Sequence, residues 1–324
     1  MTGEFDLIAR YFAPLASDYA DKLTDDCAHI PLGDGTTLLV SKDISIEGVH
    51  FPKGCPVNIA VQRALGSAFS DIPASGGLAF GYMLGVTLPK TADVTTITAE
   101  ISDTLASLQA DWTVTLLGGD TVVGDQFALS VTVFGRSKMA IKRSGAATGD
   151  AVFVTGTIGD AAAALPYVLH EDQKGQVAEN TVNQLTQRYE KPEPRLGIAD
   201  LLSEHASAAI DISDGLAADA AHIATASCVG IEIEAGRIPV SSALLAAVED
   251  AEERYHLQLT GGDDYEILFT APQAAVQKVL SASTDDIGIT LIGRVVDGQS
   301  SIIMPDGTNR PLSDFAGYDH LSSG

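Results

Sequence analysis

Residues 208–220 read AAIDISDGLAADA and contain a predicted strand, a polar loop and the start of a predicted helix. The stretch begins as a short apolar run, which is typical of a buried strand, and continues after Gly215 as an alanine-rich amphipathic segment, which predicts a helix. Between the two, Asp211, Ser213 and Asp214 place two carboxylates and a hydroxyl within four residues. Open α/β sheets bind ligands at the carboxyl ends of their strands, so these side chains are candidates for a ligand site. The alternative is that Ser213 or Asp214 only caps the helix that follows.

Further aspartates follow apolar runs elsewhere in the chain. Together with the two above, the positions are Asp26, Asp43, Asp71, Asp120, Asp211 and Asp214. Histidine and cysteine are absent from nearly all of these sites, and hard oxygen ligands without nitrogen or sulfur suit Mg²⁺, Mn²⁺ or Ca²⁺ rather than zinc. Each aspartate taken alone could be a turn or capping residue. Six of them in similar settings favour a site for divalent cations.

Length and composition narrow the class of protein. A chain of 324 residues predicts two domains, and its 45% of hydrophobic residues can supply a core for each. The net charge of −24 argues against nucleic acid and anionic membranes as partners, although bound cations would let such a chain hold polyphosphate. No apolar run reaches the roughly 18 residues of a membrane span, and the first residues do not form a signal peptide. Three cysteines without metal-binding spacing favour a reduced, cytoplasmic protein without structural zinc.

Both halves of the chain mix predicted strands with predicted helices, which indicates an α/β or mixed α+β class. In the first half, strands are expected at 37–41, 82–88, 113–117 and 127–136, and helices at 3–20, 57–72 and 94–110. In the second half, strands near 151–155, 230–234, 287–296 and 300–304 accompany helices near 179–190, 195–204, 241–255 and 272–282. A basic stretch at 136–143 lies between the halves, so we expect domains at 1–137 and 138–324.

Glycine-rich and basic segments are candidates for binding phosphate. Gly118, Gly119 and Asp120 follow a predicted strand, where two glycines let backbone N–H groups approach an anion, or simply form a tight turn. Lys142 and Arg143 could grip phosphate oxygens or could be solvated linker charges. The chain has no Walker A, HExxH or GxSxG pattern. With no nucleophile–base pair visible, the carboxylates indicate metal-assisted phosphoryl transfer, which depends on positioning and charge neutralisation.

An ordered series of motifs along nearly the whole chain resembles the thiamine-monophosphate kinase family, in the superfamily that includes aminoimidazole ribonucleotide synthetase. The motifs are Gly3-Glu4-Phe5, Asp25-Asp26, Glu47-Gly48-Val49-His50-Phe51, Ser70-Asp71, Gly118-Gly119-Asp120-Thr121, Arg143-Ser144-Gly145, Val154-Thr155-Gly156-Thr157, Asp211-Ile212-Ser213-Asp214-Gly215-Leu216, Gly261-Gly262-Asp263-Asp264-Tyr265-Glu266 and Gly317-Tyr318-Asp319-His320. The resemblance implies a two-domain aminoimidazole ribonucleotide synthetase-like fold of the mixed α/β class. It also implies a homodimer in which the N-terminal domains pair through their sheets.

By the same resemblance, the chain transfers a phosphoryl group from ATP to thiamine monophosphate, giving ADP and thiamine diphosphate, with several Mg²⁺ ions. The positions that match Mg²⁺ sites are Asp26, Ser41, Asp43, Asp71, Asp120, Asp211 and Asp214. Those that match nucleotide contacts are Gly119, Asp120, Arg143 and Ser213, and those that match the thiamine phosphate site are His50, Asp263 and Tyr318. Asp120 and Asp211 would act in catalysis through bound Mg²⁺, with no covalent nucleophile. Judged without the resemblance, His50 is an ordinary exposed histidine.

The chain departs from the family pattern at several positions. Thr24 precedes Asp25 where glycine is usual, Lys42 stands where threonine is usual, and Asp263 replaces a glutamate. The Lys42 ammonium is expected beside the Asp43 metal site, where it could replace one Mg²⁺ or weaken the site. The alternatives to the kinase are therefore a related ATP-dependent enzyme with another substrate, or a non-catalytic homologue that binds nucleotide or metal.

Overall fold

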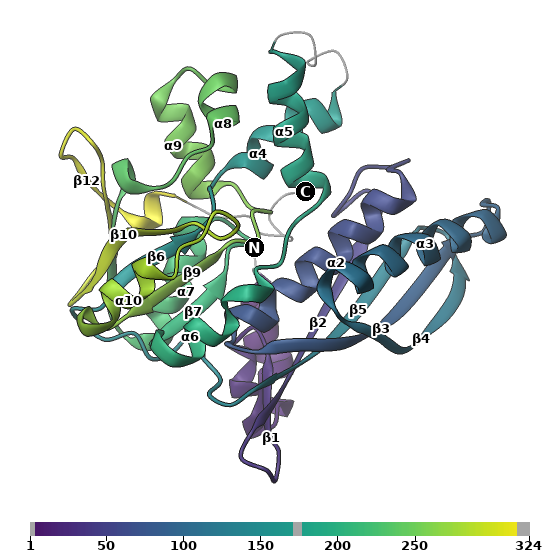
Figure 1. The fold of residues 1–324 in the computed structure, drawn as a ribbon, viewed down its shortest axis with the longest axis horizontal. Coiled ribbons are helices and arrows are strands. Elements are labelled where there is room, and N and C mark those ends of the chain that lie inside the picture. The colour runs from purple at the N-terminus through teal and green to yellow at the C-terminus, as the bar shows by residue number, and fades with distance from the viewer. Residues whose placement is uncertain (1–3, 171–176, 316–324) are drawn as a thin grey trace.

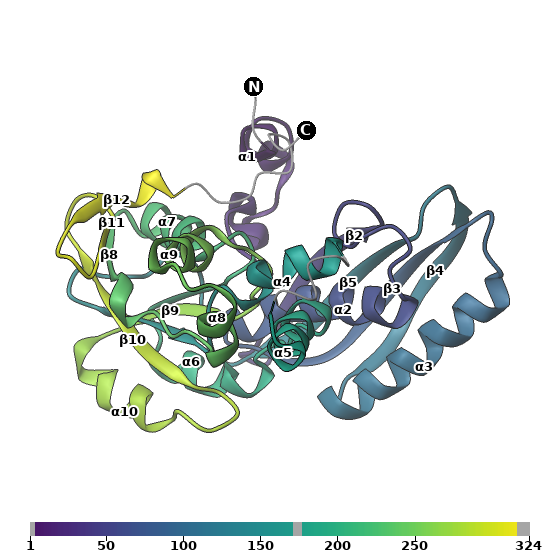
Figure 2. The same ribbon diagram turned by 90° about the horizontal axis from the view of Figure 1, so that it is seen from above.

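The structure is a computed structural model of the chain and describes residues 4–170 and 177–315. It has two lobes that lie side by side, each built on its own β-sheet (Figures 1 and 2). Residues before 138 form a five-stranded sheet, and residues after 150 form a seven-stranded sheet. The mixed α/β class is therefore confirmed. No helix in the described ranges is long and apolar enough to span a membrane.

The sheet of the N-terminal lobe has the strand order β1-β2-β5-β3-β4, in which only β3 and β4 run parallel. Its strands are β1 (Ala28–Pro31), β2 (Thr37–Ile46), β3 (Leu78–Pro89), β4 (Thr115–Gly124) and β5 (Ala128–Ser137). Helices α2 (Val57–Ala74) and α3 (Val94–Trp112) cover one face, where Phe69, Tyr82 and Leu129 are fully buried. The opposite face, called the outer face below, has neither helix against it (Figure 1).

Alternation along the strands explains why this sheet has one covered face. In β3, Tyr82 and Leu84 are buried while Met83, between them, is 43% exposed. Successive side chains of a strand point to opposite faces, so the buried set packs under the helices and the other set lies on the outer face. Ile44 and Val122 are also about half exposed on that face, at 48% and 50%. The outer face therefore exposes apolar side chains from three strands, β2, β3 and β4.

Helix α2 connects the lobes. One side packs on β2, β5 and α3, and the other approaches β7, α5 and α6 of the C-terminal lobe. Its close approach depends on small residues, because a Cβ added at Gly66 would lie 2.5 Å from the carbonyl oxygen of Pro192. The helix is therefore placed to bring its polar side chains to the boundary between the lobes.

The larger sheet has the order β12-β11-β8-β10-β6-β9-β7, in which only β8 and β11 run parallel. Its strands are β6 (Ala151–Thr155), β7 (Ala208–Asp211), β8 (Gly230–Glu234), β9 (Ile267–Ala271), β10 (Ile289–Val296), β11 (Ser301–Ile303) and β12 (Asn309–Pro311). The helices are α4 (Asp160–Leu169), α5 (Glu179–Glu190), α6 (Ala199–His205), α7 (Leu216–Ser227), α8 (Ser242–Ala247), α9 (Ala251–Thr260) and α10 (Val276–Ser281). Apolar clusters cover both faces, which is why β6, β7 and β9 are buried throughout.

Several boundaries differ from the sequence prediction. Strand β2 continues to Ile46 instead of ending near Asp43, and α2 continues to Ala74, so that Asp71 lies inside the helix. Strand β4 runs straight through Gly118 and Gly119, where a turn was expected. Neither glycine has a positive φ. A Cβ added at Gly119 would lie 1.9 Å from the carbonyl oxygen of Leu84, so this glycine is needed for strand pairing and not for a turn.

The predicted long helices at 3–20 and 241–255 are also wrong. The first consists of short helical segments, α1 (Glu4–Leu7), a π-helix (Ile8–Phe12) and 3₁₀ helices (Ala13–Leu15 and Asp18–Leu23). The second is divided into α8 and α9, because the Asp250 side chain accepts the N–H groups of Glu252 and Glu253 and so begins a new helix. Apolar periodicity marked these regions as helical but could not show where the helices break.

Candidate functional site

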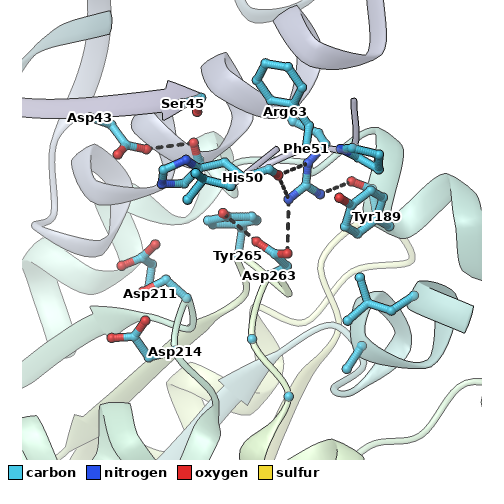
Figure 3. Close-up of a pocket in the computed structure, with 18 of the residues that line it drawn as sticks. Asp43, Ser45, His50, Phe51, Arg63, Tyr189, Asp211, Asp214, Asp263 and Tyr265 are labelled. Carbon is cyan, nitrogen blue, oxygen red and sulfur yellow. Dashed lines mark hydrogen bonds and ion pairs between the residues drawn. The ribbon is translucent and has the colours of Figure 1, made fainter. Parts of the chain in front are cut away.

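A cavity of about 1020 Å³ lies between the two lobes. The N-terminal lobe contributes residues of β2, the loop at 48–53 and α2, and the C-terminal lobe contributes the loops at 211–214 and 260–265. Figure 3 shows side chains of both lobes directed into this space. Its volume is at the upper end of the range for ligand sites, and such sites form preferentially between domains.

Three carboxylates from distant parts of the chain meet beside the cavity, which Asp71 and Asp211 line. Asp26 precedes β1, Asp71 lies on α2, and Asp211 ends β7. Their carboxylate oxygens lie within 4.8 Å of one another. Oδ2 of Asp26 is buried without a hydrogen-bond partner among the described residues. Oxygen ligands of this kind, close together and with an unused lone pair, fit a hard divalent cation.

The electrostatics of the three carboxylates also fit a cation. Burial, followed by the charges of Asp211 and Asp26, raises the pKa of Asp71 well above its usual range. Burial, followed by the charge of Asp26, raises the pKa of Asp211 to about 7. Burial also raises the pKa of Asp26, against the opposing effect of Arg143. Desolvation and mutual repulsion disfavour three charged carboxylates here, and a bound cation would relieve both effects.

Hydroxyls and one arginine hold this cluster in place. Ser41 donates to Asp71, and Ser70 donates to Oδ2 of Asp211 at 2.5 Å, which links α2 to the end of β7. Nε of Arg143 lies 3.1 Å from Oδ1 of Asp26. The Arg143 side chain is only 19% exposed, so it is not a solvated linker charge.

Two further predicted metal ligands line the cavity beside the cluster. Asp43 faces α2, where Oδ2 accepts a hydrogen bond from Ser67 at 2.8 Å. Asp214 lies on the loop after β7, and its carboxylate comes within 4.8 Å of ligand atoms of Asp219 and His222. These two residues of α7 were not among the predicted site residues. Their separation of three positions on a predicted helix, next to a candidate ligand loop, was the available signal.

The loop that carries Ser213 and Asp214 is fixed by a side chain of the next helix. Oδ2 of Asp219 accepts the backbone N–H groups of Ser213 and Asp214 at 3.1 and 3.2 Å. Ser213 itself lines the cavity. Asp219 therefore orders the loop ahead of α7, whose N-cap is Gly215 without a side-chain cap hydrogen bond.

The structure does not bring Asp120 to the other aspartates within one chain. Asp120 is exposed on β4 and is paired with Gly85, which places it on the outer face of the sheet, away from α2. Gly119 lies in the same strand, so it does not form the expected anion-binding turn. Lys42 lies at the edge of the cavity, but its Nζ donates to Ser130 on the outer face, and not to the carboxylates. The alternation of β2 explains this difference between Lys42 and Asp43.

The two described residues of the predicted acceptor site, His50 and Asp263, also line the cavity. His50 comes from the loop after β2, and its Nδ1 accepts the N–H of Ile46 at 3.1 Å. In the neutral ring this leaves the proton on Nε2. Asp263 comes from the loop between α9 and β9, where its Oδ1 accepts the hydroxyl of Tyr265 at 2.9 Å. Tyr318, the third predicted residue, lies outside the described residues.

The loop at 260–265, which carries Asp263, is held against the loop at 211–214, which carries Asp214, by backbone hydrogen bonds. The N–H of Asp263 donates to the carbonyl of Ser213 at 3.0 Å, and the N–H of Tyr265 donates to that of Ile212 at 2.8 Å. A Cβ added at Gly262 would lie 2.3 Å from the carbonyl oxygen of Ser213, so only glycine permits this approach. Asp263 and Tyr265 have φ of 68° and 50°, which is uncommon for residues with side chains. Such conformations persist where the surrounding structure enforces them, often at functional sites.

Sequence reasoning missed Arg63, which links the two lobes beside the acceptor site. It lies on α2 and is 5% exposed. One of its terminal nitrogens lies 3.0 Å from Oδ2 of Asp263 (Figure 3). The signal in the sequence was an arginine among small and apolar residues of the helix predicted at 57–72.

Comparisons with known proteins agree along the whole chain. The family models for the AIR synthase related proteins match residues 24–137 with the N-terminal domain and residues 147–305 with the C-terminal domain. The thiamine-monophosphate kinase of Salmonella typhimurium is 37% identical, and the match covers 99% of both chains. That of Escherichia coli is 36% identical, again over 99% of both chains.

Solved structures show the same likeness. The structure of AaThiL complexed with AMPPCP and TMP superimposes with a TM-score of 0.86 at 30% identity, covering 98% of this chain and 97% of that one. Thiamine monophosphate kinase from Aquifex aeolicus gives a TM-score of 0.80 at 30% identity, covering 94% and 97%. The hydrogenase maturation protein HypE in complex with ATP, at 18% identity and a TM-score of 0.68, shares the fold, with 95% and 93% covered. This chain belongs to the thiamine-monophosphate kinase family, within the AIR synthase related proteins.

Proposed function

We propose that this chain transfers the terminal phosphoryl group of ATP to thiamine monophosphate, giving ADP and thiamine diphosphate. The observation that carries the proposal is the convergence of Asp26, Asp71 and Asp211 at a cavity that His50 and Asp263 also line. A donor and an acceptor phosphate can meet in this shared cavity. The related AaThiL structure was obtained with AMPPCP and TMP, which supports the same pair of ligands here.

The carboxylates would hold the Mg²⁺ ions that such a transfer requires. Asp26, Asp71 and Asp211, with the hydroxyl of Ser41, form the central donor set, and Asp43 and Asp214 extend it along the cavity. Bound Mg²⁺ neutralises the charge of the phosphate groups. This explains how a strongly acidic chain can accept two phosphorylated substrates.

The remaining site residues would bind and orient the two substrates. Arg143, held at the cluster by Asp26, and Ser213, which lines the cavity on the loop after β7, would contact the nucleotide phosphates. His50 presents a protonated Nε2 with which to donate to an acceptor oxygen, and Asp263 supplies a fixed carboxylate beside it. Tyr318 stays a predicted acceptor contact. No covalent intermediate is needed, because positioning and charge neutralisation suffice for direct transfer.

We further propose that the chain forms a homodimer through the outer face of the N-terminal sheet. That face exposes apolar residues, among them Ile44, Phe80, Met83 and Val122. β4 is one edge of the sheet and β2 lies near the other. A twofold axis through the middle of the outer face would bring β4 of the partner, with its Asp120, over β2, whose outer face carries Lys42 beside the cavity. Asp120 would then complete the metal site of the other subunit.

We also propose a domain boundary and a cellular location for the protein. We place the boundary between residues 137 and 138, where β5 ends and the chain passes to the second sheet. All three cysteines are free thiols, which is consistent with a reducing cytoplasmic environment.

A coupled ADP-release assay, with and without thiamine monophosphate, tests the activity. We expect Mg²⁺-dependent ADP release that requires thiamine monophosphate. ADP release with a different acceptor would indicate a related enzyme, and nucleotide binding without turnover would indicate a non-catalytic homologue. Lys42 was part of the support for a non-catalytic homologue. The contact of Lys42 with Ser130, away from the carboxylates, weakens that support.

A further inference from the structure

We propose that Arg63 is a positioning residue for the acceptor: it holds His50 and Asp263, which belong to different lobes, in the one arrangement that binds thiamine monophosphate. This inference rests on the proposed function, because His50 and Asp263 are the acceptor contacts named there. Arg63 lines the cavity, but its guanidinium donates to protein acceptors, so its effect passes through these two residues.

The contacts of Arg63 converge from three parts of the chain. Within its own lobe, Nε and one terminal nitrogen donate to the carbonyl oxygen of His50 at 3.3 and 3.1 Å. The same terminal nitrogen reaches Oδ2 of Asp263 in the other lobe at 3.0 Å. The other terminal nitrogen donates to the carbonyl oxygen of Tyr189, which belongs to α5. One guanidinium therefore fixes the backbone at His50, the side chain of Asp263 and the end of α5.

The planar guanidinium of arginine suits this role, whereas the ammonium of a lysine does not. The guanidinium lies over the ring of Tyr189, with its carbon 3.6 Å from the ring centroid. A planar fork with several donors can serve three acceptors and an aromatic face at once, whereas an ammonium is a single point charge. Arg63 is buried, and a buried charge is retained at a cost unless its partners are well placed.

Asp263 depends on these contacts for its orientation. Its two carboxylate oxygens are divided between the lobes, since Oδ1 accepts from Tyr265 and Oδ2 from Arg63. Its backbone is in the left-handed region, with φ of 68°, which an aspartate does not favour unless it is held there. The side chain of Asp263 is 33% exposed and lines the cavity, so it is both held and accessible. Without Arg63, the carboxylate would keep its loop but lose the partner that joins it to the lobe of His50.

The test is a double-mutant cycle between Arg63 and Asp263, read as steady-state kinetics on the full chain with Mg²⁺. Arg63→Gln should raise KM for thiamine monophosphate about tenfold or more, the effect of losing a charged hydrogen bond, while KM for ATP changes by less than about twofold. Arg63→Lys should give an intermediate rise, since it keeps the charge but not the fork. The double variant Arg63→Gln with Asp263→Asn should lie nearer the larger single effect than the product of the two.

Arg195→Gln is the matched control. Arg195 is also a buried arginine, and it pairs with the buried carboxylate of Glu266 without lining the cavity. It should lower the melting temperature while the ratio of the two KM values stays as in the wild type. The proposal would be overturned if Arg63→Gln changed both KM values equally, or if the effects of Arg63→Gln and Asp263→Asn on KM simply multiplied in the double variant. It would also be overturned if Arg195→Gln raised KM for thiamine monophosphate as much as Arg63→Gln does. If Arg63→Gln does not fold, Arg63→Lys must still separate the two KM values. Failure of the proposed function would appear separately, as wild-type protein without acceptor-dependent ADP release.

Discussion

At the scale of single residues, Asp211 has the strongest claim to a metal ligand. It ends a buried strand, and its carboxylate meets those of Asp26 and Asp71. Asp211→Asn keeps the shape and removes one charge, but an amide is a poor ligand for Mg²⁺. We expect turnover at saturating Mg²⁺ to fall by several orders of magnitude, about 10³-fold or more, with the fold intact. Near-normal ADP release from a folded variant would show that Asp211 serves only the local turn.

The stability of Asp211→Asn relative to the wild type should also depend on pH. The pKa of Asp211 rises from 3.8 to about 7 on folding, chiefly through burial. A raised pKa means that the folded state binds the proton more tightly, so the contribution to stability is complete below about pH 4 and is lost as the pH rises towards 7. Asparagine does not titrate. With divalent cations removed by a chelator, the melting temperature of Asp211→Asn should therefore lie a few degrees above that of the wild type near pH 8. The difference in melting temperature should shrink near pH 5. A constant difference across that range would contradict the repulsion described for the cluster.

His50→Ala should have a different kinetic effect, because His50 is a predicted contact of the acceptor. Its Nδ1 is occupied by the N–H of Ile46, so Nε2 carries the proton with which to bind the acceptor. His50→Ala should raise KM for thiamine monophosphate about tenfold and change KM for ATP much less. His205→Ala, in α6 and away from the cavity lining, is the control. Equal effects on both substrates would remove His50 from the acceptor site.

At the scale of elements, the contact between the loops at 211–214 and 261–266 depends on Gly262. A Cβ there would lie 2.3 Å from the carbonyl oxygen of Ser213, whereas one at Gly33 meets nothing within 4 Å. Gly262→Ala should push the loops apart and reduce kcat/KM for both substrates by about 10²-fold, since misplacement by about 1 Å is enough for such a loss. Gly33→Ala should leave both values unchanged. The steady-state rates of the two variants, measured with their melting curves, decide whether the loop contact matters for the reaction.

Elements also show where sequence reasoning lost accuracy. The predicted strand before Asp43 and the predicted turn at Gly118-Gly119 both became the interior of longer strands. Polar and glycine residues are typical of loops, but β2 and β4 pair along their full lengths with β5 and β3. Pairing between strands satisfies the backbone at these positions and overrides the local preference. The strand and helix of the stretch at 208–220 are confirmed, because local preference and packing agree there.

At the scale of the whole molecule, the position of Asp120 makes the proposed dimer testable. Inactive Asp120→Asn and Asp211→Asn chains are mixed, unfolded and refolded together. If Asp120 acts in the partner's site, each mixed dimer has one site with both aspartates intact. Half of the dimers are mixed, so about a quarter of the wild-type activity should return. If Asp120 acts within its own chain, every site lacks one aspartate and no activity returns. Refolding each variant alone is the control.

The residues alone predicted the kind of chemistry and the family. Aspartates without histidine or cysteine indicated a divalent cation, and the ordered motifs indicated the kinase family. Which of these groups meet depends on the packing of distant segments, and the folded chain was needed to see it. Asp26, Asp71 and Asp211 converge although 45 and 140 residues separate them, whereas Asp120 lies on the outer face of the sheet. Arg63 became visible only through its contacts with both lobes. The physical reason is that periodicity and turn residues encode local conformation, while proximity between distant segments depends on how helices and sheets pack against one another.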